Sequence, residues 1–196
     1  MFNQSFWRYQ HAAGLFLVLG FVANLTGVLM FAFSNGILGN LPRATTFVMG
    51  ERSILALAVV LTMVGFVLLE GYLAATKGGV FARIGASTYF FAAVLVVVAE
   101  TLGFTLREEQ TYGVVVGYIV LAFLAQASIG VALLQSGIVA AWIGWGAILW
   151  NLAWLVALPL ISPQDLYFPI LHHLVPLVIG IALLRKSHDP RAIRDE

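Results

Sequence analysis

The sequence predicts an all-α bundle of six transmembrane helices, and its composition leads to that fold class. Apolar residue types make up 61% of the 196 positions, whereas Asp, Glu, Lys and Arg make up 10%. A soluble domain is about 45–50% apolar and about 25% charged, so these few charges cannot cover a surface exposed to water. A net charge of +1 without a basic block excludes disorder and nucleic-acid binding. Cysteine is absent, which excludes disulfides and thiolate metal sites.

Charged residues divide the chain into stretches long enough for spanning helices, which need about 20 mostly apolar residues. The first stretch is too long for the core of a signal peptide, so we interpret it as a span. The long stretch between Glu109 and Asp165 holds no charged residue, and Gln135-Ser136-Gly137 is its turn signal. That stretch therefore contains two spans. The six predicted spans are 11–33, 53–76, 84–105, 112–134, 138–161 and 166–184.

Six spans place both termini on one side of the membrane, and the basic residues indicate which side. The side of the termini carries Arg8, Lys77, Arg83, Arg185, Lys186, Arg191 and Arg194, against Arg43, Arg52 and Arg107 on the other. Because basic residues concentrate in cytoplasmic loops, we expect both termini in the cytoplasm. Residues 1–186 then form one membrane domain, and 187–196 form a short charged cytoplasmic tail.

Part of the chain repeats itself at a constant offset. Gly71, Gly78, Val80, Ala82, Ile84 and Gly85 correspond to Gly130, Gly137, Val139, Ala141, Ile143 and Gly144. Spans two and three would thus form one helical hairpin, and spans four and five a second one in the same orientation. Parallel repeats occur in transporters, but similar glycine-containing turns also arise from packing requirements alone.

Ionisable side chains inside spans are costly and mark candidate sites. We expect an outer layer in which Glu100, near the end of span three, faces a histidine in the outer half of span six. A carboxylate with an imidazole can bind a divalent metal, relay protons or hold a polar ligand. Alternatively, Glu100 pairs with an arginine near the interface, Arg52 or Arg107. The candidate residues of this layer are Glu100, His172, His173, Arg52 and Tyr112, with Glu100 and His172 as ligands if a metal binds.

Pro176 adds a feature to the same region. A proline inside a helix removes the hydrogen bond to the carbonyl four residues earlier, which is that of His172. We therefore expect a kink beside His172 and a carbonyl available to a ligand.

An inner layer contains Glu70, His11 and Lys77. Glu70 and Lys77 are seven residues apart on one expected helix face, so Glu70 pairs with Lys77 or with His11 from span one. A structural ion pair is the simpler interpretation of this layer.

Two cofactors are disfavoured by the positions of these residues. A bis-histidine haem needs two imidazoles at one depth, whereas His11 is predicted at the inner end and His172 in the outer half. Retinal needs a lysine in the middle of a span for its Schiff base, and no span has one. Other cofactors stay undetermined.

The turns also carry a resemblance. Glu51-Arg52 opens span two, one inner turn reads Gly-Val-Phe-Ala-Arg-Ile-Gly, and another reads Gln-Ser-Gly-Ile-Val-Ala-Ala-Trp-Ile-Gly-Trp. Over spans two to five this pattern resembles an uncharacterised bacterial family of six-helix integral membrane proteins. The resemblance implies the same fold class and the bacterial inner membrane, with no catalytic residues to transfer.

Three classes of function are compatible with this pattern. The first is a small membrane protein with a polar ligand- or proton-binding cavity in the outer half, related to transport. The second is a structural or accessory subunit, whose partners besides lipid are other membrane subunits or further copies of the chain. The third is an intramembrane enzyme using Glu100 and His172, which lacks a nucleophile motif.

Overall fold

A computed structural model describes residues 3–34, 45–102, 108–162 and 168–186. This part of the chain is helical throughout, apart from short turns, and contains no strand. The predicted all-α class is therefore confirmed. The helices are α1 (Asn3–Ser34), α2 (Thr45–Leu73), α3 (Gly79–Leu102), α4 (Glu108–Ser136), α5 (Ala141–Ile161) and α6 (Pro169–Lys186).

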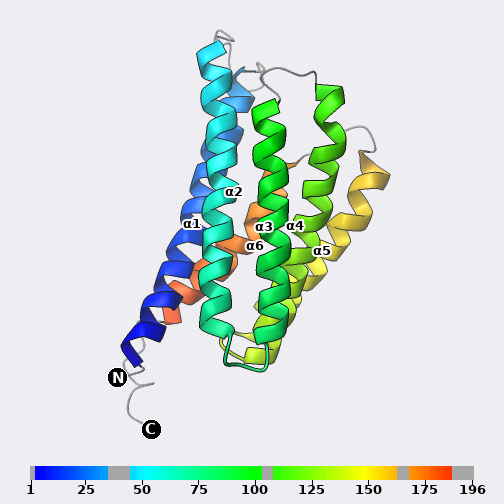
Figure 1. Ribbon diagram of the computed structural model, residues 1–196. Helices are drawn as coiled ribbons and strands as arrows, with labels where there is room; N and C mark the ends of the chain where they lie inside the picture. The colour runs from blue at the N-terminus through cyan, green and yellow to red at the C-terminus, as the bar shows by residue number, and fades with distance from the viewer. Residues whose placement is uncertain (1–2, 35–44, 103–107, 163–167, 187–196) are drawn as a thin grey trace.

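The six helices run alternately up and down (Figure 1). The start of α1 and the end of α6 lie at the same end of the bundle as the α2–α3 and α4–α5 turns. From α1 to α5, consecutive helices pack side by side. The last helix, α6, returns to pack against α1 and makes few contacts with α4 and α5. This arrangement agrees with the even number of spans predicted from the sequence. We call the end with the two turns the inner end.

Close backbone contact joins the first and last helices. A Cβ atom on Gly14 would lie 2.9 Å from the carbonyl oxygen of Gly180, and a Cβ atom on Gly180 would lie 2.9 Å from the carbonyl oxygen of Gly14. Gln10 adds a side-chain hydrogen bond of 2.7 Å from its Nε2 to the carbonyl of Leu183. Small residues at such crossings let helices approach closely in a membrane. This contact fixes the register of α1 against α6.

Within the residues that the structure describes, five helices are long and apolar enough to cross a membrane, and α6 is shorter. Its apolar segment, Ile170–Arg185, is shorter than the apolar segments of the other five helices. At 1.5 Å per residue this segment extends roughly 24 Å. A hydrocarbon core is about 30 Å thick. The sixth predicted span therefore forms as a helix but covers less of the membrane than its neighbours. In Figure 1 it runs obliquely behind the other helices.

The turn predicted at residues 135–137 forms at residues 137–140, because α4 continues through Ser136. Gly137 ends α4 with a φ of 63°, in the left-handed region that favours glycine. The two hairpins, α2–α3 and α4–α5, have the predicted common orientation (Figure 1). Their packing differs, because a Cβ on Gly130 would lie 2.8 Å from the Gly144 carbonyl oxygen, whereas the corresponding Gly71 has only Tyr9 within 4 Å. The repeat is thus shared in topology and not in helix contacts.

Candidate functional site

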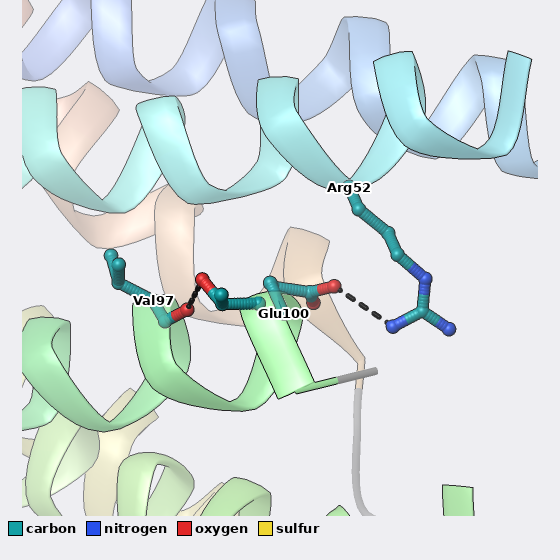
Figure 2. Close-up of polar contacts among 4 residues, drawn as sticks. Arg52, Val97 and Glu100 are labelled. Carbon is teal, nitrogen blue, oxygen red and sulfur yellow. Dashed lines mark hydrogen bonds and ion pairs between the residues drawn. The ribbon is translucent and has the colours of Figure 1, made fainter. Parts of the chain in front are cut away.

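Glu100 and Arg52 form an ion pair at the outer end of the bundle. The Arg52 Nη1 lies 3.1 Å from the Glu100 Oε2, joining α2 to the last turn of α3 (Figure 2). Glu100 is 9% exposed, so the carboxylate is largely removed from lipid and water. Next to it, the Thr101 hydroxyl donates to the Val97 carbonyl on the same helix. Of the two alternatives for Glu100, the structure contains the arginine pair.

His172 lies deeper than the sequence predicted. Its ring centroid is 4.2 Å from that of Phe123 and 5.4 Å from that of Tyr118, both on α4. Phe123 is the central residue of the apolar segment Gln110–Ser136 of that helix. His172 is fully buried, and its neighbour His173 is 1% exposed. The two histidines therefore belong to the middle of the bundle.

Helix register shows that Glu100 and His172 do not share one layer. A Cβ on Gly117 of α4 would lie 3.2 Å from a side-chain carbon of Leu95 on α3, so Glu100, one and a half turns further along α3, is level with Tyr112. The rings that contact His172 are six and eleven residues inward of Tyr112, which corresponds to roughly 9–16 Å. The expected outer layer is corrected in this respect: Glu100, Arg52 and Tyr112 lie at its level, and the histidines lie below it.

The physical reason is the length of α6. The expected depth of His172 was counted from the start of a span assumed to reach the outer interface. The helix instead begins at Pro169, with the histidines in its first turn, and its inner end is fixed by the contact of Gly180 with Gly14. A short helix fixed at its inner end starts inside the bundle.

The carbonyl freed by Pro176 has a protein partner. The Nε2 of Gln126 donates to the carbonyl oxygen of His172 at 2.8 Å. The indole Nε1 of Trp150 donates to the next carbonyl toward the N-terminus, that of Leu171, at 3.1 Å. Pro176 therefore leaves this carbonyl without a helical partner, as predicted. The side-chain amide of Gln126 donates to it, so it is not available to a ligand. Both bonds position the first turn of α6 against α4 and α5.

Several side chains at this depth hold polar atoms without a hydrogen-bond partner. They are both ring nitrogens of His172, both amide atoms of Asn24, and the amide oxygens of Gln126 and Asn151. The Tyr89 hydroxyl is buried as well and is hydrogen-bonded with the side chains of Thr62 and Tyr118. The four residues with unpaired atoms and Tyr89 are all 0% exposed. We call this set the central polar layer: Asn24, Tyr89, Gln126, Asn151 and His172.

Helix contacts place the five residues in the middle part of the bundle. Gly14 of α1 contacts Gly180 of α6. Asn24, which lies ten residues further along α1, is therefore opposite the first turn of α6. Gly130 of α4 contacts Ala147 of α5. One turn further outward on each helix, Gln126 therefore lies opposite Asn151. Tyr89, in the middle of α3, packs edge-on against Phe66 in the inner half of α2, with ring centroids 4.9 Å apart. Five different helices therefore contribute one polar group each.

Such a layer is costly in hydrocarbon. A buried polar group without a partner costs about 1–3 kcal/mol, and no bulk water reaches the bilayer core to compensate. Polar groups buried in membrane helices are therefore typical of sites that bind a substrate or conduct an ion or a proton. The unpaired atoms include donors and acceptors, so the layer can serve a small molecule that offers both, water included.

The inner pair differs from the prediction in its partner. The Nε of Arg83 lies 3.3 Å from the Glu70 Oε1, across the α2–α3 hairpin. The prediction of Lys77 as partner assumed a continuous helix, but α2 ends at Leu73, so the seven-residue spacing no longer defines one face. The arginine side chain is 74% exposed, which makes this a surface pair at the inner end. His11 is half-buried near the same end, in the first third of α1.

The positions of the histidines and carboxylates bear on metal and haem ligation. Among the described residues, no group of three or more His, Asp or Glu side chains is arranged to hold a metal ion. His11 lies close in sequence to Gly14, which contacts Gly180, two turns from His172 along α6. The two histidines therefore lie on different levels of the bundle.

Comparison with known proteins gives no relative for this chain. No family model, no curated protein and no solved structure matches it. The fold and the buried polar residues therefore carry the functional argument, and the resemblance of the turn motifs to a bacterial six-helix family stays a prediction.

Proposed function

We propose that this multi-pass membrane protein binds a proton or a small polar solute at the central polar layer and takes part in its transport. The observation that carries the proposal is His172, a fully buried imidazole with both ring nitrogens unpaired at the middle of the bundle. An imidazole presents a donor and an acceptor on opposite sides of one ring. It can therefore receive a proton or ligand on one side and release it on the other.

The remaining members of the layer support the same role. Near the depth of His172, the amide groups of Asn24, Gln126 and Asn151 provide uncharged donors and acceptors. Uncharged groups bind a polar solute without the cost of burying a permanent charge in hydrocarbon. The charged pair Arg52–Glu100 lies toward the outer end, where it can attract a polar solute before it reaches the layer.

We further propose a cell membrane as the location, the inner membrane of a bacterium, with both termini in the cytoplasm. The excess of Lys and Arg on the side of the termini supports this orientation, and the resemblance of the turn motifs supports the bacterial membrane. The alternative role as an intramembrane enzyme required Glu100 and His172 to act on one bond, and their separation in depth removes that support.

The test starts with the protein purified alone in mild detergent, followed by reconstitution into liposomes. Native mass spectrometry, an absorption spectrum and metal analysis of one sample show what is bound. A pH gradient across the liposomes, followed with an entrapped pH-sensitive dye, uses the proton as probe, and swelling in glycerol or urea uses neutral solutes. We expect faster relaxation of at least one gradient than in empty liposomes, and its loss in His172→Phe.

The matched control is Thr26→Val. Thr26 lies two residues from Asn24 on α1, is exposed to lipid, and bonds its own helix through the Val22 carbonyl at 2.9 Å. This variant should behave as the unmodified chain. A particle that binds nothing, relaxes no gradient and is stable only with co-purifying proteins would overturn the proposal and favour an accessory subunit.

A further inference from the structure

A groove separates α5 from α6 at the inner end of the bundle. Its volume is about 910 Å³, and it lies between the α4–α5 turn, the first residues of α5 and the last turns of α6. The few contacts between α5 and α6 leave it open. The side chains that form its apolar walls are Ile138, Ile143, Val178, Ile181 and Ala182.

The groove opens to the membrane. Val178 and Ile181 are 38% and 36% exposed, and Trp142 at the edge of the groove is 67% exposed. Tryptophan is typical of the headgroup level of a bilayer. The volume equals that of roughly thirty water molecules, but apolar walls give water few hydrogen-bond partners. A lipid acyl chain is the occupant that such walls favour.

One end of the groove is positively charged. Arg185, in the last turn of α6, lines it and is exposed, and it forms no ion pair with the residues that the structure describes. On the facing side, α5 begins at Ala141 without a side-chain cap on its first amide groups. Both features favour an anion at the headgroup level.

We propose that this groove binds one anionic phospholipid, with an acyl chain along the apolar walls and the phosphate at Arg185. The lipid belongs to the leaflet on the side of the chain termini. Its acyl chain fills the space between α5 and α6, so that the lipid completes the side of the bundle where direct helix contact is weak. This site is independent of the central polar layer.

The experiment titrates the purified protein in mild detergent with phosphatidylglycerol or with phosphatidylcholine of the same acyl chains. Native mass spectrometry counts retained lipids, and glycerol phosphate serves as a soluble phosphate probe. Both lipids carry a phosphodiester, but the choline cation offsets its charge in phosphatidylcholine. Attraction of Arg185 to the net negative headgroup should therefore give phosphatidylglycerol about a tenfold advantage. Arg185→Gln should remove that advantage, whereas Ala182→Phe should lower retention of both lipids by filling the groove.

Lys77→Gln is the matched control, because it removes one exposed basic charge at the same end of the bundle outside the groove. It should keep the preference for phosphatidylglycerol. The proposal is overturned if Arg185→Gln keeps it too, if the unmodified protein retains both lipids equally, or if glycerol phosphate competes as well as the lipid. Thermal unfolding of each variant without added lipid verifies that it is folded.

Discussion

Replacing His172 by phenylalanine should stabilise the ligand-free protein while abolishing the activity proposed for the central polar layer. His172 is 0% exposed, and its ring already packs against Phe123 with centroids 4.2 Å apart. A phenyl ring preserves that aromatic contact and removes two polar atoms that have no partner. The substitution thus separates the requirement for stability from the requirement for function at one position.

The size of the effect follows from the polar atoms. A neutral imidazole has one donor and one acceptor, and each unpaired buried group costs about 1–3 kcal/mol. Accommodating the slightly larger ring in a packed core costs about 1–3 kcal/mol. Taking the middle of each range, we expect a net gain of about 2 kcal/mol, and each kcal/mol raises the Tm of a chain of this length by about 2–4 °C.

The assay is thermal unfolding in mild detergent after removal of any co-purifying ligand, with the liposome measurement on the same preparations. Asn24→Leu is a second variant, since both amide atoms of Asn24 are buried and unpaired, and it should also raise the Tm. Thr26→Val, on the lipid-facing side of the same helix, should change the free energy of unfolding by less than about 0.5 kcal/mol.

A decrease in Tm of several degrees for His172→Phe would refute the reasoning. It would show that the imidazole nitrogens have partners in the resting protein, so that the layer is a structural hydrogen-bond network. An increase in Tm with unchanged proton or solute flux would keep the energetic argument and reject the functional one.

Three further perturbations test the architecture by thermal unfolding. Gln126→Leu removes the donor to the His172 carbonyl and should cost about 1–3 kcal/mol, but much less in a Pro176→Ala background, where the restored backbone N–H takes its place; equal costs in both backgrounds would contradict this. Gly78→Ala should cost about 1–3 kcal/mol or more, because its Cβ would overlap the backbone of α4; an unchanged Tm would mean a looser hairpin. Glu100→Gln should cost about 1–2 kcal/mol, between exposed and buried ion pairs, and no loss would make that pair dispensable.

The sequence is sufficient to predict features that depend on local chemistry. Runs of apolar residues define the six helices, because the length of an apolar run decides whether a helix can cross the membrane. The turn at Gly137 follows from glycine at a left-handed position. The carbonyl of His172 is freed by Pro176 whatever the tertiary structure is, so that prediction holds while the identity of its partner, Gln126, depends on packing.

Features that depend on how one helix packs against another could not be predicted from the sequence. Glu70 pairs with Arg83 because α2 ends at Leu73 and the chain turns back, and a spacing rule for a continuous helix misses this. The depth of His172 depends on where α6 begins inside the bundle, which hydropathy does not define. A useful signal was the shortness of the last apolar stretch, bounded by Pro169 and by Arg185.

The short span of α6 is what brings His172 into the central polar layer. If the histidines in the first turn of α6 lay at the outer interface, they would be among hydrated headgroups, where an imidazole is satisfied by water. With the inner end fixed where Gly180 meets Gly14, the short helix instead brings His172 to the level of Asn24 and Gln126. Residues that would be ordinary at an interface thus become buried polar groups in hydrocarbon, which is the setting in which they bind a proton or a polar solute.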